Sequence, residues 1–91
     1  GQYTPDYEAH ELSTQRICLI ESKYDLEGKD SDENVEKLKA LSIILPPVYR
    51  CILMCGHDED MSVFEYINGI EHKLTYETLF AKAPTKRPRS L

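Results

Sequence analysis

Apolar residues follow a strand-like pattern in the first third of the chain. The segment Arg16-Ile17-Cys18-Leu19-Ile20-Glu21 contains four consecutive apolar residues, two of them β-branched. Such a run is typical of a buried strand. We therefore predict a strand over about 16–22, followed by the polar, turn-forming segment 28–32.

A helical pattern follows. Apolar residues recur at three- and four-residue spacing, at Val35, Leu38, Leu41, Ile44 and Leu45. Ser31 or Asp32 can cap the start, and Pro46-Pro47 ends the element because the residue before a proline avoids helical angles. We predict a helix over 33–44. A strand over 40–45 is the alternative, since Ile43-Ile44-Leu45 is also strand-like.

The clearest local signal is the pair Asn68-Gly69 between two apolar runs. A type I′ turn needs positive φ at both central residues, which Asn tolerates and Gly adopts freely. Strands are predicted at 48–55, 61–67 and 70–75. They form an antiparallel three-stranded meander.

The rest of the chain is assigned around this core. We expect a polar N-terminal extension at 1–15, one globular domain at 16–83 that ends in a short helical turn at 77–83, and a basic, proline-containing tail at 84–91. The tail can be a linker, a nuclear-localisation stretch or an arm that touches a polyanion.

Composition limits the function. The 91 residues form one small core, and a cofactor pocket of about 300–1,000 Å³ is large for a domain of this size. We expect neither catalysis nor a cofactor. The net charge of −5 disfavours nucleic acid and anionic membranes, and no apolar run is long enough to span a bilayer. Three cysteines, an odd number, suggest an intracellular, reducing compartment, nuclear or cytoplasmic.

The cysteines offer one candidate metal site. Cys51 and Cys55 share a strand face and are followed by His57. The two thiols would lie about 13 Å apart along a strand, too far for one tetrahedral zinc ion unless the strand bends. We predict instead that the cysteines are small core residues.

The aromatic residues of the meander are the candidate binding residues. Phe64 and Tyr66 alternate onto one strand face, and Tyr49 lies on the preceding strand. Such rings either pack in a core or converge on a bound cation.

The meander resembles a Tudor domain, a member of the Royal family of SH3-like barrels. Val48-Tyr49-Arg50-Cys51 is similar to the family's aromatic-Tyr-Arg-small motif, and the segment from Val63 to Gly69 is similar to its second strand and turn. Tyr76-Glu77-Thr78-Leu79 is similar to its closing turn. The resemblance implies a small barrel with a peptide groove. Asn68 replaces a cage aromatic and Ile70 replaces the family's methylarginine-binding Asn, so an unmodified peptide or a partner subunit is the expected ligand.

A second architecture accommodates the helix. Strand 16–22, helix 33–44 and strands 48–55 and 61–67 give a β-α-β-β order that is similar to an RNA-recognition motif, an α+β sandwich. This alternative implies RNA binding or dimerisation.

The sequence thus predicts a mainly β domain with one or two short helices, a Tudor-like barrel that serves as a protein-interaction adaptor within a regulatory or RNA-processing assembly. The candidate peptide-binding residues are Tyr49, Phe64, Tyr66 and Asn68.

Overall fold

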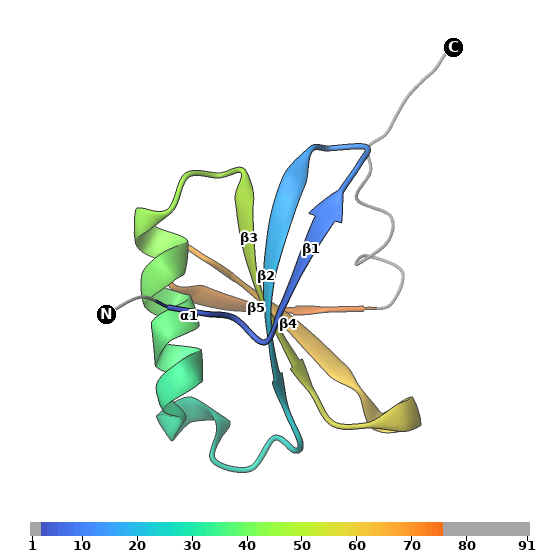
Figure 1. The fold of residues 1–91 in the computed structure, drawn as a ribbon. Helices are drawn as coiled ribbons and strands as arrows, with labels where there is room; N and C mark the ends of the chain where they lie inside the picture. Colours follow the sequence, from blue (N-terminus) through green and yellow to red (C-terminus); the bar gives the residue numbers. More distant parts are fainter. Residues whose placement is uncertain (1–2, 76–91) are drawn as a thin grey trace.

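Strands and helices follow the order β-β-α-β-β-β in the computed structural model, which describes residues 3–75 (Figure 1). The strands are β1 (Tyr7–Glu11), β2 (Arg16–Lys23), β3 (Tyr49–Cys55), β4 (Ser62–Ile67) and β5 (Ile70–Leu74). The α-helix is α1 (Glu33–Ile44), and two single 3₁₀ turns are η1 (Lys29–Ser31) and η2 (Asp58–Asp60). The mainly β class with a helix is confirmed.

The described strands form one open sheet in the order β1-β2-β3-β4-β5. All neighbours are antiparallel except β2 and β3, which run parallel. A parallel pair needs a long crossover, and α1 supplies it. The sheet is open, with β1 and β5 as its edges, so the closed barrel that we expected is not formed by residues 3–75.

The helix prediction is confirmed at both ends, and the alternative strand over 40–45 is wrong. Asp32 is the N-cap, and one of its carboxylate oxygens accepts hydrogen bonds from the amides of Asn34 and Val35 at 2.8 and 3.3 Å. The last helical residue is Ile44, two residues before Pro46. The β-α-β-β order of our second architecture is present, with the strand β1 added before it.

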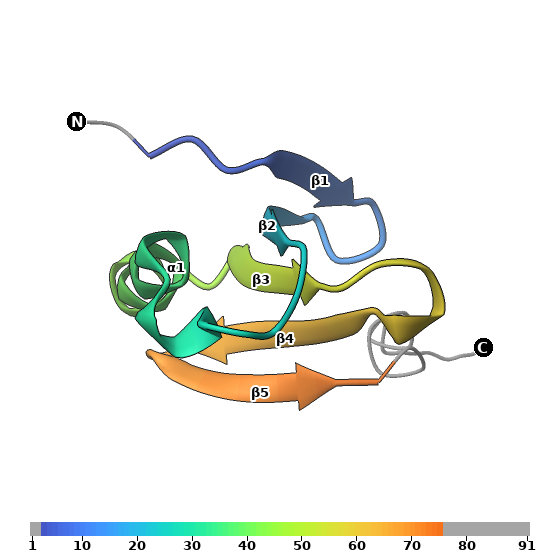
Figure 2. The same ribbon diagram turned by 90° about the horizontal axis from the view of Figure 1, so that it is seen from below.

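Helix α1 covers one face of the sheet (Figure 2). Val35 and Leu38 are fully buried there against β3 and β4. The sheet side of this core consists of Cys51, Leu53, Cys55, Phe64 and Tyr66. The opposite face of the sheet carries the alternate residues of the same strands.

The predicted meander is confirmed. Strand β4 pairs antiparallel with both β3 and β5, and Ile67 lies opposite Ile70. Asn68 and Gly69 have φ of 52° and 80°, as a type I′ turn requires. The segment 1–15, which we expected to be an extension, contains the edge strand β1. The predicted helical turn at 77–83 and the tail at 84–91 lie outside the described residues.

Candidate functional site

A cavity of about 210 Å³ lies at the end of the sheet where β4 turns into β5. Its walls come from the start of β2 and β3, the end of β4, and the last turn of α1 with the Pro-Pro segment after it. The lining residues are Arg16, Ser42, Leu45, Pro46, Pro47, Tyr49, Glu65, Tyr66, Ile67 and Asn68. We call this site the turn-end cavity.

Three of the four predicted binding residues line this cavity. Tyr49, Tyr66 and Asn68 meet there because β3 and β4 pair antiparallel, so that the first residue of one strand lies near the last residue of the other. Phe64 does not line it. The Phe64 ring lies in the core under α1 and is 6% exposed.

The cavity is built on a turn that is tied to the helix. The Gly69 amide donates a hydrogen bond to Ser42 Oγ at 2.8 Å, and the Ser42 hydroxyl donates to the carbonyl of Lys39 at 2.7 Å. A Cβ atom at Gly69 would lie 3.1 Å from Cδ1 of Ile43. Glycine therefore serves both the positive φ of the turn and its close contact with α1.

Phe64 and Tyr66 share one face, as alternation predicted, but that face is the one α1 covers. The Lys29 ammonium lies 4.9 Å from the centre of the Phe64 ring, and Lys39 lies 5.9 Å from that of Tyr66. These contacts are cation–π interactions made by the chain itself. The two rings therefore belong to the core, and they do not converge with Tyr49 into a cage.

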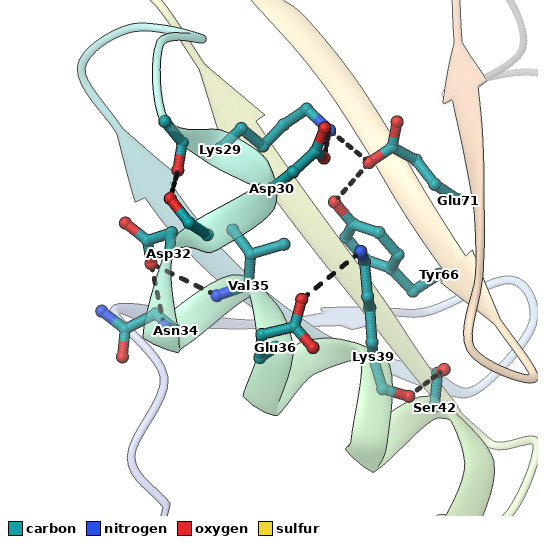
Figure 3. Close-up of polar contacts among 12 residues, drawn as sticks. Lys29, Asp30, Asp32, Asn34, Val35, Glu36, Lys39, Ser42, Tyr66 and Glu71 are labelled. Carbon is teal, nitrogen blue, oxygen red and sulfur yellow. Dashed lines mark hydrogen bonds and ion pairs between the residues drawn. The ribbon is translucent and has the colours of Figure 1, made fainter.

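A polar network closes the core beside these rings (Figure 3). The Tyr66 hydroxyl donates to Glu71 Oε1 at 2.9 Å, and Lys29 Nζ donates to the same oxygen at 2.5 Å. Burial and the Glu71 carboxylate hold the pKa of Tyr66 well above its usual range. Tyr66 is 2% exposed and belongs to the core, and it is also one of the residues that line the turn-end cavity.

Charged residues border the cavity on the face away from α1. Arg50 Nε donates to Glu65 Oε2 at 3.0 Å, Nη2 donates to Glu65 Oε1 at 2.7 Å, and Nη1 donates to Glu11 Oε2 at 2.7 Å. Hydrogen bonding to Glu65, although opposed by burial, raises the pKa of Arg50 above its usual range. Arg16 lies 3.9 Å from Glu65 Oε2. Sequence analysis missed this cluster, which joins β1, β2, β3 and β4.

The cysteines pack as core residues, as predicted. Cys51 and Cys55 are buried under α1, and Cys18 is buried on the other face of the sheet. Burial, with the nearby Glu65 carboxylate, raises the pKa of the Cys51 thiol to about 11. Burial likewise raises the pKa of Cys18 and of Cys55. All three side chains are therefore protonated at neutral pH and lack the thiolate character of reactive cysteines.

The structure does not bring His57 to the cysteines. Its ring is stacked on Tyr24, with ring centres 4.8 Å apart, in the exposed loops beyond the other end of the sheet. Within residues 3–75, no three His, Cys, Asp or Glu side chains are grouped closely enough to hold a metal ion. In the same range, no helix has the length and apolar character needed to cross a membrane.

Comparison with known proteins gives no further information about this site. No family model, curated protein or solved structure matches the chain. The functional argument therefore depends on the site itself.

Large apolar side chains are exposed on or next to the elements that form the turn-end cavity. Ile43 and Ile44 on α1 are 61% and 73% exposed, and Ile67 and Ile70 beside the turn are 48% and 61% exposed. Val48, next to the Pro-Pro segment, is exposed as well. Exposed large apolar residues close to a cavity are typical of a surface that binds another protein.

Proposed function

We propose that this domain is a non-catalytic protein-interaction module that holds a peptide or a loop of a partner protein at the turn-end cavity. The observation that carries the proposal is the cavity itself, with Leu45, Tyr49 and Ile67 in its wall and further exposed isoleucines on α1 and beside the β4–β5 turn. Such apolar anchoring pockets are the usual centres of protein interfaces.

The volume of the cavity favours a peptide over a small-molecule ligand. Pockets for cofactors and drug-sized ligands are about 300–1,000 Å³. The turn-end cavity, at about 210 Å³, suits one or two amino-acid side chains. The polar groups of Ser42 and Asn68 at its wall can orient the backbone of a bound segment.

Charge also favours a protein partner over RNA, the alternative that the sequence left open. Arg50 is 4% exposed and bound by Glu65 and Glu11, so its guanidinium cannot neutralise a phosphate without breaking those bonds. The Tudor resemblance, and with it a role in a regulatory or RNA-processing assembly, supports the same class of function and remains a prediction.

The test is a selection of displayed random peptides on the full chain, followed by affinity measurements with single variants. We expect Tyr49→Ala or Ile67→Glu to weaken binding at least about tenfold, because residues that anchor a pocket typically contribute more than 1 kcal/mol. Met61→Glu is the matched control, since Met61 is 40% exposed and lies just before the first residue of β4, at the end of that strand away from the turn. Thermal unfolding of each variant separates lost binding from lost folding.

The proposal is wrong if no selected peptide binds, or if the selected peptides bind the Tyr49 and Ile67 variants as tightly as the parent chain. Fluorescence anisotropy with single-stranded RNA at low salt provides the comparison for the alternative function. RNA binding that persists in Ile67→Glu would favour the alternative instead.

A further inference from the structure

A second cavity lies next to the turn-end cavity, at the same end of the sheet. It has a volume of about 300 Å³ and is formed by the end of β1, the start of β2 and the loop between them, so we call it the hairpin cavity. Arg16 lines both cavities. Ile17 of the hairpin cavity lies opposite Tyr49 of the turn-end cavity, on the neighbouring strand. One bound segment can therefore occupy both cavities.

The acidic residues of the two cavities are already bound by a buried arginine. Glu65 lines the turn-end cavity, and Glu11 lines the hairpin cavity. Arg50, which is 4% exposed, donates two hydrogen bonds to Glu65 and one to Glu11. Both carboxylates therefore have a cationic partner that does not depend on Arg16.

The environment of Arg16 differs from that of Arg50. The Arg16 side chain is 37% exposed, and its guanidinium lies 3.9 Å from Glu65 Oε2. That distance is longer than a hydrogen bond of about 2.7–3.2 Å, and the guanidinium donates no hydrogen bond to any group of residues 3–75. A guanidinium can bind a carboxylate through two parallel hydrogen bonds. Arg16 therefore supplies the two cavities with a cation that can bind a carboxylate of a ligand.

We propose that the partner segment occupies both cavities and places the side chain of an Asp or Glu on Arg16, between apolar residues. This inference rests on the proposed interaction function and specifies the chemistry of the partner. Exposed apolar residues line each cavity, Leu12 the hairpin cavity and Ile67 the turn-end cavity. Two strand spacings, about 10 Å, separate the β1–β2 pair from the β3–β4 pair, and three extended residues span that distance. A side-chain carboxylate suits this position better than a carboxyl terminus, because the bound chain continues on both sides of Arg16.

The test is a selection on the full chain with two libraries of random peptides, one held within a loop of the display protein and one with a free carboxyl terminus. We expect the loop library to yield peptides with Asp or Glu at a fixed position. Changing that residue to Asn or Gln should weaken binding to the parent chain about tenfold, since a charge-assisted hydrogen bond is lost. The same change should weaken binding to Arg16→Gln less than about twofold, because the two groups interact directly.

Lys73→Gln is the matched control, since it removes one positive charge from an exposed residue of β5 that lines neither cavity, and it should behave like the parent chain. Arg16→Lys keeps the charge and should keep the preference for an acidic peptide.

The outcomes separate this inference from the proposed function. An equal effect of the acid-to-amide change on the parent chain and on Arg16→Gln would overturn the inference. If Tyr49→Ala still weakened binding in that case, the interaction module would stand without it. Acidic peptides selected from the free-terminus library alone would assign Arg16 to a terminal carboxylate and would also overturn the inference. If neither library yielded a binder, the proposed function and the inference would both fail.

Discussion

The buried ion pair between Arg50 and Glu65 offers the sharpest test of how this sheet is stabilised. The substitution is Glu65→Gln, which keeps the shape of the side chain and removes its charge. Arg50 is 4% exposed, and Glu65 receives two of the three hydrogen bonds that its guanidinium donates to glutamates. After the substitution, Glu11 is the one carboxylate still hydrogen-bonded to Arg50 among the described residues.

Burial decides the size of the effect. An exposed ion pair contributes about 0–1 kcal/mol because water and salt screen it. Removing one partner of a buried pair costs about 3–5 kcal/mol, since the remaining charge stays desolvated. The glutamine can still accept one hydrogen bond, so we expect about 3 kcal/mol. That loss is a large share of the total stability of a small domain, about 5–15 kcal/mol.

Urea unfolding followed by circular dichroism measures the loss. The control is Glu36→Gln, which removes a surface pair with Lys39 at 3.6 Å and should change stability by less than about 0.5 kcal/mol. The double variant Arg50→Met/Glu65→Leu removes both charges, so it should recover most of the stability that Glu65→Gln loses. If Glu65→Gln costs no more than Glu36→Gln, the pair behaves as a solvated one and the reasoning from burial is refuted.

Three further comparisons test other parts of the fold, each by urea unfolding. Gly69→Ala should lower the free energy of unfolding more than Gly28→Ala. Both glycines have positive φ, but a Cβ added at Gly69 would lie 3.1 Å from an isoleucine of α1, whereas a Cβ added at Gly28 would meet nothing within 4 Å. Asp32→Ala should cost about 1 kcal/mol or more through the lost N-cap, and Ser31→Ala should cost less. Burial raises the pKa of Glu11, but hydrogen bonds from a threonine and an arginine outweigh it, so the pKa is below its usual range. The stabilisation by Glu11 is therefore present above its unfolded pKa of about 4.3 and lost as the pH falls through the lower folded value, so Glu11→Gln should destabilise at pH 7 and have little effect at pH 2.

Each of these expectations has a contradicting result. Equal losses of stability in Gly69→Ala and Gly28→Ala would mean that the α1 isoleucine can move away from the added Cβ without an energetic penalty. A larger loss of stability in Ser31→Ala than in Asp32→Ala would mean that the helix is capped by Ser31 rather than by Asp32. A Glu11→Gln penalty that stays constant from pH 7 to pH 2 would show that packing, rather than charge, gives that residue its effect.

Residues with strong local preferences made much of the fold predictable. Asp32 and Pro46 delimit α1, and Asn68-Gly69 places the β4–β5 turn, because caps, prolines and positive φ act within a few residues. The strand β1 was missed since its sequence, Tyr-Glu-Ala-His-Glu, is mostly polar and its side chains are largely exposed at a sheet edge. Nothing local marks such a strand, whose pairing with β2 depends on distant residues.

The candidate site was predictable in part for a related reason. Alternation correctly placed Phe64 and Tyr66 on one face, but it does not say which face a helix will cover. The contribution of Leu45 and the Pro-Pro segment to the turn-end cavity depends on where the end of α1 packs. The sheet is open because β1 and β5 stand at opposite ends of the strand order, a feature of tertiary packing that the barrel-like motifs did not indicate.

The parallel pairing of β2 with β3 has a consequence for how the chain folds. The β1–β2 hairpin and the β3–β4–β5 meander are each assembled from neighbouring residues, and such local pieces form quickly. Joining them brings Ile17 to Tyr49 across the length of the intervening helix, which costs loop-closure entropy before any packing repays it. We expect this union to be the rate-limiting event of folding. Substitutions where α1 meets β3 should then slow refolding, whereas those at the β1 edge should mainly speed unfolding.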